Sequence, residues 1–103
     1  MSANVIVEEQ KQDLLNIYQI NGLSQYVYMI DDMINENYRG VNFIEHSLLK
    51  DPEIPNHEQI CFEIYLTSEP DEAIEDQRKF YKALIKLIPS DKRHFFTFTY
   101  RVS

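Results

Sequence analysis

Residues 60–67 read ICFEIYLT and residues 94–102 read HFFTFTYRV, and these two stretches decide the fold. In both, large apolar side chains alternate with other residues, which is the period of a β-strand with one buried face. Residues 70–88, between them, carry apolar side chains at helical spacing. A crossover helix between two strands returns the chain as a parallel neighbour of the first strand. The block therefore predicts a strand, a helix and a second, parallel strand.

The first half of the chain predicts two helices separated by Gly22, because glycine is the residue type that most often ends a helix. Residues 10–20 have the apolar spacing of the first helix. The second covers residues 24–37, where one helical stripe is formed by Leu23, Val27, Ile30 and Ile34. Tyr26 and Tyr28 alternate within the same segment, so a short strand is the alternative.

A less regular segment precedes the strand at residues 59–67. In residues 41–49 neither alternating face is wholly apolar, which is typical of an edge strand with some solvent on both sides. Residues 51–57 contain Pro52 and Pro55, and proline lacks the N–H that a central strand needs. We therefore expect residues 41–49 and 59–67 to pair as a β-hairpin with a long, irregular connection.

The helix at residues 70–88 has the clearest signals. Pro70 occupies the first turn, where its missing N–H costs nothing, and Pro89 ends the helix. Acidic side chains crowd its N-terminal half and basic side chains its C-terminal half, which complements the helix dipole. We expect a broad apolar face to pack on the sheet, formed by Ile74, Tyr81, Ile85 and Ile88 and flanked by Ala73, Phe80, Leu84 and Leu87.

Together these elements predict a single α+β domain over residues 1–103. The expected architecture has two layers in the order α-α-β-β-α-β, with the helices packed on one face of a small mixed sheet. A chain of 103 residues can bury a modest core, and its 44% hydrophobic content is that of a folded protein. Residues 1–8 are expected to be disordered.

Composition limits the classes of function. The net charge is −7, and nucleic-acid affinity comes largely from basic side chains that neutralise phosphates, so a nucleic-acid binder is disfavoured. No apolar run approaches the roughly 18 residues that a membrane span needs, and the first residues lack a secretory signal pattern. Cys61 is the only cysteine, which excludes an intramolecular disulfide and is typical of a reducing compartment. We expect a cytoplasmic protein that binds neither nucleic acid nor membrane.

The sequence contains no recognisable cofactor or metal motif. Gly22 and Gly40 are the only glycines, too few for a phosphate-binding loop, and the acidic residues 69–76 lack the central glycine of a calcium loop. Cys61 is expected to be a small buried group. The histidines do not have the spacing of a zinc site, and each is expected at the surface or at an edge: His46, His57 and His94. We therefore expect no cofactor and no metal ion.

An enzyme is the alternative. Asp51 lies twelve residues before Glu63, with the first acid in a loop and the second on the next strand, and this order resembles that of the PD-(D/E)xK nucleases. The resemblance implies a small metal-dependent hydrolase or nuclease that uses Asp51 and Glu63, with His57 as a further candidate. That family places a lysine where this chain has Tyr65. Without the lysine, no cation stabilises the charge that develops in the reaction, which makes this the second hypothesis.

The leading hypothesis is a non-enzymatic domain that acts by protein–protein interaction. If the large apolar residues of the two strands face the helices, the opposite sheet face is semi-polar and contains tyrosine and arginine, which are enriched at binding hot spots. We expect Glu63 to meet Arg101 there if the strands are neighbours. The candidate interaction face comprises Glu63, Tyr65, Thr97, Thr99 and Arg101. The acidic charge predicts a regulator or neutralising partner of a basic protein, and self-association through a sheet face or an edge strand is also expected.

Overall fold

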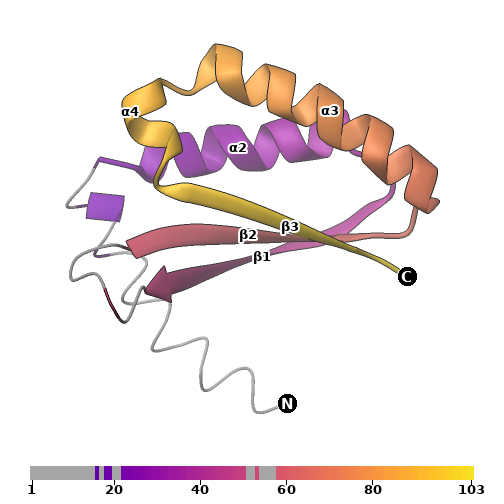
Figure 1. The fold of residues 1–103 in the computed structure, drawn as a ribbon, viewed down its shortest axis with the longest axis horizontal. Helices are drawn as coiled ribbons and strands as arrows, with labels where there is room; N and C mark the ends of the chain where they lie inside the picture. The colour runs from indigo at the N-terminus through magenta and orange to yellow at the C-terminus, as the bar shows by residue number, and fades with distance from the viewer. Residues whose placement is uncertain (1–15, 17, 20–21, 51–52, 54–57) are drawn as a thin grey trace.

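The computed structural model describes residues 16, 18–19, 22–50, 53 and 58–103. Within this range the elements follow in the order α2 (Ser24–Asn37), β1 (Val41–Lys50), β2 (Glu58–Leu66), α3 (Pro70–Leu87), the single turn α4 (Ser90–Arg93) and β3 (Phe96–Val102). Figure 1 shows the strands as one layer and the two long helices as a second layer above it. The predicted α+β class and two-layer architecture are confirmed.

The three strands form one mixed sheet in the order β1-β2-β3. β1 runs antiparallel to β2, in a register that places Ile44 opposite Ile64. β3 runs parallel to β2 and places Phe98 opposite Phe62. The predicted hairpin and the predicted parallel return after the crossover helix are therefore both confirmed, and β1 and β3 are the two edges of the sheet. The proline-containing connection after β1 lies, except for Glu53, outside the described residues.

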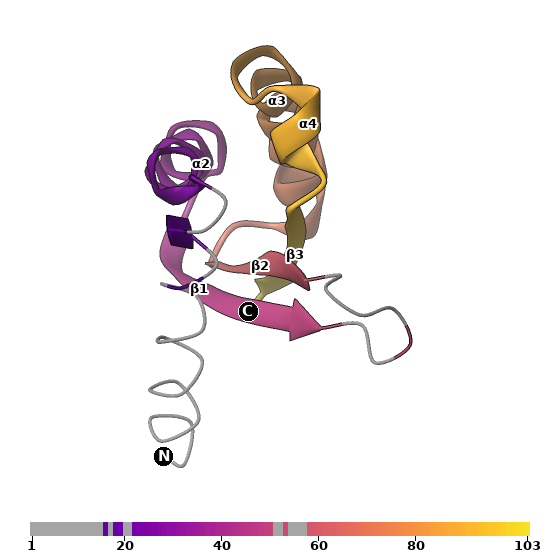
Figure 2. The same ribbon diagram turned by 90° about the vertical axis from the view of Figure 1, so that its left-hand side faces the viewer.

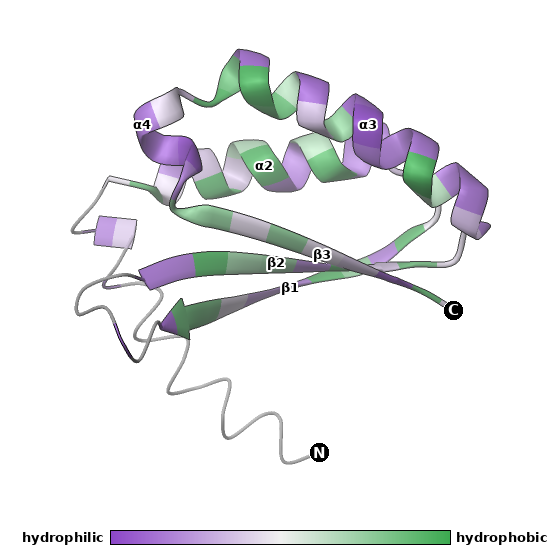
Figure 3. Ribbon diagram, in the orientation of Figure 1, coloured by the Kyte–Doolittle hydropathy of each residue, from purple (hydrophilic) through white to green (hydrophobic). Residues whose placement is uncertain are grey.

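The hydrophobic core lies between the sheet and the two long helices. The hydropathy alternates along the strands, as Figure 3 shows, and the residues of β2 that face the helices are almost completely buried: Ile60, Phe62, Ile64 and Leu66. The Phe62 ring contacts the rings of Phe96 and Phe98, with centroids 5.9 and 5.3 Å away. Residues 24–37 form a helix, so the strand alternative for this segment is wrong. The predicted apolar stripe of this helix is buried in the core as well.

The packing face of α3 differs from the predicted one. Of the predicted broad face, Ala73, Phe80, Leu84 and Ile88 are buried, as expected. Ile74 and Ile85, which were expected to pack on the sheet as well, are 45% and 60% exposed. The physical reason is that α3 carries apolar residues on two flanks, and periodicity alone does not decide between them. A buried polar contact of Asp76, described next, accompanies the buried flank, and Ile74 and Ile85 lie on the outer flank.

Arg39, in the turn between α2 and β1, binds the N-terminal half of α3. Its backbone N–H donates to Asp76 Oδ2 at 2.8 Å and its side-chain Nε donates to the same oxygen at 3.1 Å. The two outer guanidinium nitrogens donate to Glu72 Oε2 at 3.1 Å and to Glu75 Oε1 at 2.8 Å. The acids that complement the helix dipole therefore also hold α3 against this turn.

The Asp76 carboxylate is the buried half of this contact, with a side chain only 1% exposed. Burial by itself would raise the pKa of Asp76, but the hydrogen bonds and positive charge of Arg39 outweigh burial and hold that pKa below its ordinary value. The same hydrogen bonds raise the pKa of Arg39. The pair therefore stays charged at neutral pH.

Gly40 allows the turn to approach the start of α3. Its φ of 66° lies in the left-handed region, and an added Cβ would lie 2.8 Å from Thr67 Oγ1. The backbone N–H of Thr67 donates to the Gly40 carbonyl at 2.8 Å. Both the dihedral angle and the lack of space therefore require glycine here.

Only the end of the predicted first helix falls within the described residues. Asn16, Tyr18 and Gln19 have helical backbone, and Gly22 has a φ of 65°. The backbone N–H of Leu23 donates to the Tyr18 carbonyl at 2.8 Å, which together with the left-handed glycine is typical of a helix C-terminus. The expected stop at Gly22 is confirmed. The rest of residues 10–20, and all of residues 1–8, lie outside the described residues.

Candidate functional site

The face of the sheet opposite the helices is the first candidate site, and we call it the open face. Figure 2 shows α2 above β1 and α3 above β3, both on the same side of the sheet. The register places Thr97 opposite Cys61, Thr99 opposite Glu63 and Arg101 opposite Tyr65. All five residues of the predicted interaction face therefore share the open face. From β1 it also receives Phe43, Glu45 and Ser47.

An aromatic and charged cluster occupies one half of the open face. The rings of Phe43 and Tyr65 stack with centroids 4.2 Å apart. The Tyr65 hydroxyl donates to Glu63 Oε1 at 2.6 Å, and Arg101 Nε donates to Glu63 Oε2 at 2.9 Å. The Arg101 guanidinium also lies 6.0 Å from the centre of the Tyr65 ring. The expected contact between Glu63 and Arg101 is confirmed.

The hydrogen bonds of this cluster set its protonation states. The Tyr65 hydroxyl, and then Arg101, hold the pKa of Glu63 below its ordinary value. The bond to Glu63 raises the pKa of Tyr65, and the same carboxylate raises the pKa of Arg101. At neutral pH the cluster therefore holds one carboxylate, one guanidinium and one neutral phenol.

Glu45 adds a second carboxylate to the open face. It is exposed and lies directly opposite Glu63 in the β1–β2 register. Two like charges at opposite positions of a sheet destabilise each other. Arg101 forms an ion pair with Glu63, and the charge of Glu45 also helps to raise the pKa of Arg101, so this arginine offsets part of the repulsion. A cationic group placed between the two carboxylates would remove this repulsion. The stacked rings of Phe43 and Tyr65 next to them offer such a group an aromatic surface.

Cys61 lies in the other half of the open face, away from the aromatic and charged cluster. It is buried, as expected, and burial raises the pKa of its thiol, while hydrogen bonds from Thr99 and Ser47 act in the opposite direction. A thiol with a raised pKa is a poor nucleophile at neutral pH. This half of the face is therefore small and polar, in contrast to the aromatic and charged half.

The residues of the enzyme hypothesis are not brought together within the described structure. Asp51 and His57 lie outside the described residues, so their relation to Glu63 is not part of it. Both carboxylate oxygens of Glu63 already accept hydrogen bonds, from Tyr65 and from Arg101. Among the described residues, no three His, Cys, Asp or Glu side chains are grouped as a metal site would require.

A pocket of about 260 Å³ on the other side of β1 is a second candidate site that the sequence did not reveal. His46 and Asp31 meet there, with Nε2 and Oδ1 2.9 Å apart. The His46 ring also packs edge-on against Phe62 at 4.9 Å, so it joins α2 to the core. His46 was expected to be a surface or edge residue, and it does lie on an edge strand. Its contact with Asp31 was not predicted. The remaining lining residues are Tyr18, Ser24, Val27 and Tyr28.

The lining of the pocket is more apolar than polar, because its residues include Val27 and the rings of Tyr18 and Tyr28. Burial, followed by the charge of Asp31 and the neighbouring Tyr28, raises the pKa of Tyr18 to about 12, so its hydroxyl stays a hydrogen-bond donor. One sequence signal could have revealed the pair. His46 has the same strand parity as Ile44 and Leu48, and a polar side chain at an inward position needs a partner.

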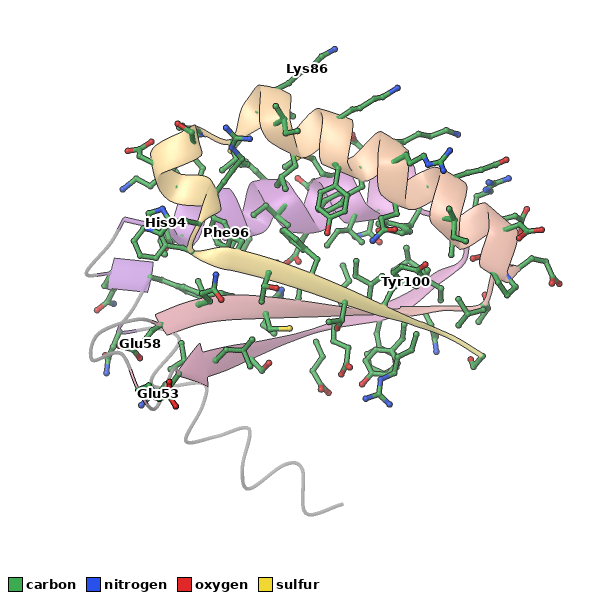
Figure 4. All side chains as sticks on the ribbon, viewed as in Figure 1. Glu53, Glu58, Lys86, His94, Phe96 and Tyr100 are labelled. Carbon is green, nitrogen blue, oxygen red and sulfur yellow. The ribbon has the colours of Figure 1, made fainter. Side chains whose placement is uncertain are left out.

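The other histidine within the described residues, His94, follows α4, and its ring lies 4.2 Å from that of Phe95. Figure 4 labels it beside Phe96 at the start of β3. It is exposed, as the sequence predicts.

The comparisons with known proteins add no identification. No family model, no curated protein sequence and no solved structure matches this chain. Across residues 16, 18–19, 22–50, 53 and 58–103, no helix has the length and apolar character needed to cross a membrane. The function must therefore be argued from the open face and the pocket themselves.

Proposed function

We propose that this chain is an interaction domain that binds a basic protein partner through the open face of its sheet. The observation that carries the proposal is the position of Glu45 directly opposite Glu63, beside the stacked rings of Phe43 and Tyr65. Two carboxylates and an aromatic surface form a suitable site for a lysine or arginine side chain.

The net charge of −7 supports a partner of opposite sign, because complementary charge increases the rate of encounter and disfavours acidic competitors. The acidic half of α3 is less suited to the same task. There, Glu72, Glu75 and Asp76 already bind Arg39 of the same chain. On the open face, Glu63 likewise binds Arg101 of the same chain. The carboxylate that this face offers to a partner is therefore Glu45, which is exposed.

The experiment compares two variants that each neutralise one exposed carboxylate. Glu45→Gln changes the open face, and Asp71→Asn changes the exposed first turn of α3. Immobilised wild-type protein and both variants are incubated with an extract of the native host. Proteins that wild type and Asp71→Asn retain, but Glu45→Gln does not, are then purified, and their Kd is measured by calorimetry at two salt concentrations.

The proposal expects a basic protein whose affinity falls with added salt. Loss of one charged hydrogen bond costs about 1.5–3 kcal/mol, so Glu45→Gln should weaken binding at least about tenfold. Asp71→Asn should bind like wild type. A purified partner that binds Glu45→Gln as tightly as wild type would overturn the proposal, and so would a partner that is acidic.

A further inference from the structure

The outer edge of β3 and the flank of α3 above it form one continuous surface. Figure 2 shows α3 over β3, on the side of the molecule away from α2. The Tyr81 ring of α3 lies edge-on against Phe98 of β3 at 6.1 Å, which ties the flank to the strand. Ile74 and Ile85 extend the flank on either side of Tyr81. The sequence predicted that both would pack on the sheet, but both are exposed to solvent.

The backbone of β3 is available for pairing along this edge. Ile60 donates to the Phe95 carbonyl, and Ser103 donates to the Leu66 carbonyl, so the odd-numbered residues of β3 bond to β2. In a parallel ladder the alternate residues point the other way. The N–H and C=O groups that face outward therefore belong to Phe96, Phe98, Tyr100 and Val102. None of these four residues is a proline or a charged residue, and the β2–β3 register contains no bulge. Within the described β3 the charged side chain is that of Arg101, which belongs to the open face and pairs with Glu63.

The residues of this surface are self-complementary about a two-fold axis. If two β3 strands pair antiparallel about Thr99, Phe98 lies opposite Tyr100 of the second copy, and Phe96 lies opposite Val102. If two α3 helices run antiparallel about a point between Lys79 and Phe80, Ile74 lies opposite Ile85 and Arg78 lies opposite Tyr81.

One two-fold axis can serve both pairings. Phe98, next to the centre of β3, contacts the rings of Phe80 and Tyr81, next to the centre of α3, with centroids 5.0 and 6.1 Å away. The two centres therefore lie one above the other. A symmetric dimer requires that a single patch be complementary to itself, and this surface meets the requirement in both layers.

The charges of α3 favour the same arrangement. Its first turn is acidic, with Asp71 and Glu72, and its last turn is basic, with Lys86. Figure 4 shows Lys86 pointing away from the sheet into solvent. Antiparallel helices place the acidic half of each beside the basic half of the other, and their dipoles also oppose. This local complementarity offsets the repulsion between two chains of charge −7.

We propose that two copies of this chain associate through the β3 edge and the Ile74–Tyr81–Ile85 flank of α3, which gives a continuous six-stranded sheet. The helices of both copies then cover one face of this sheet, and the two open faces form one larger surface on the other. The inference does not depend on the proposed function, because it concerns a different surface of the molecule.

The first test is the mass of the full chain by light scattering during gel filtration, over a range of concentrations. The expected mass is twice 12.3 kDa. Ile74→Glu alone, or Ile85→Lys alone, should shift the species to monomer, because each sets a charge against an isoleucine. The double variant sets the new carboxylate opposite the new ammonium and should restore the dimer. Leu87→Glu, an exposed apolar residue of α3 outside the flank, is the matched control and should remain dimeric.

The second test reports the register directly and is made in a Cys61→Ser background. Thr99 lies on the axis, so Thr99→Cys brings two thiols within the 4.4–6.8 Å Cα separation of a disulfide, and oxidation should link the chains. Thr97→Cys is the control. Position 97 lies opposite position 101 of the second copy, so the two cysteines are four residues apart along the strands, or about 13 Å. A monomer at every concentration would overturn the proposal. So would a dimer that all the α3 variants leave intact, or equal linkage through positions 97 and 99.

Discussion

The two faces of the sheet are formed by the same strands but differ in burial and composition. On β2, Phe62 and Ile64 face the helices and are completely buried, whereas their neighbours Glu63 and Tyr65 face outward and are partly exposed. A shift of one residue thus separates a side chain that holds the fold together from one that is available to a partner. The covered face is apolar and packed by two helices. The open face carries the stacked rings of Phe43 and Tyr65 and the facing carboxylates of Glu45 and Glu63, and no long helix of the described residues covers it.

Under the proposed function, the stability of the fold and the binding of a partner should be separable in this molecule. A change on the covered face should mainly alter the free energy of unfolding, and a change on the open face should mainly alter binding. The predictions below either sharpen that division or break it.

The largest effect is expected from Phe62→Ala. Phe62 is fully buried and contacts Phe96 and Phe98, so its removal leaves a cavity that should cost about 3–5 kcal/mol. Thr99→Ala, on the exposed side of the neighbouring strand, should cost less than about 0.5 kcal/mol. Urea unfolding followed by circular dichroism measures both. Equal losses in the two variants would break the division between the faces.

A smaller loss is expected from Asp76→Ala, which removes the buried acceptor of Arg39. We expect about 2–3 kcal/mol, because several hydrogen bonds to a charged group are lost together. Asp71→Ala, on the exposed side of the same helix, should cost less than about 1 kcal/mol. If the two variants unfold at the same urea concentration, Arg39 does not anchor α3.

The Asp76 contact also predicts how stability depends on pH. The pKa of Asp76 is lower in the folded chain than in the unfolded chain, so its contribution is complete above the unfolded pKa and is lost as the pH falls through the folded pKa. Between about pH 5 and about pH 2, wild type should therefore lose more stability than Asp76→Asn. Thermal unfolding at a series of pH values measures the difference. Parallel curves for the two proteins would contradict the prediction.

A smaller loss of stability than that of Phe62→Ala or Asp76→Ala is expected from Phe43→Ala. Phe43 is 48% exposed and stacks on Tyr65, and a cross-strand aromatic pair contributes at most about 1 kcal/mol. The same variant should weaken binding of the basic partner, because the aromatic surface beside the two carboxylates is lost. Urea unfolding and calorimetry on one preparation give both numbers. A large loss of stability with unchanged affinity would reverse the roles of the faces.

The strands could be predicted from the sequence because their alternation is local. β2 and β3 have a clear two-residue period, and the helix between them is long enough for a parallel return. The less regular β1 was expected as an edge strand in a hairpin with β2, so the class and strand order followed. The open-face contact of Glu63 with Arg101 followed from the same parity. Phe43 and Glu45 were not predicted as part of the site, because the faces of a mixed edge strand cannot be assigned until its register is known.

The orientation of α3 and the pocket could not be predicted, because both depend on contacts between distant residues. Arg39 and Asp76 are 37 positions apart, and their contact joins α3 to the turn before β1. Asp31 and His46 are 15 positions apart and meet only when α2 packs on β1. Local periodicity has no information about either pairing.

The most direct test of the central claim is an NMR titration of the ¹⁵N-labelled chain with a hexa-arginine peptide, with hexa-glutamate as the control. The account predicts salt-sensitive shifts centred on Glu45, Glu63 and Arg101, and none with hexa-glutamate. Glu45→Gln should reduce these shifts, and Asp71→Asn should not. Shifts centred on Glu72 and Glu75 of α3, with the open face unchanged, would contradict the account.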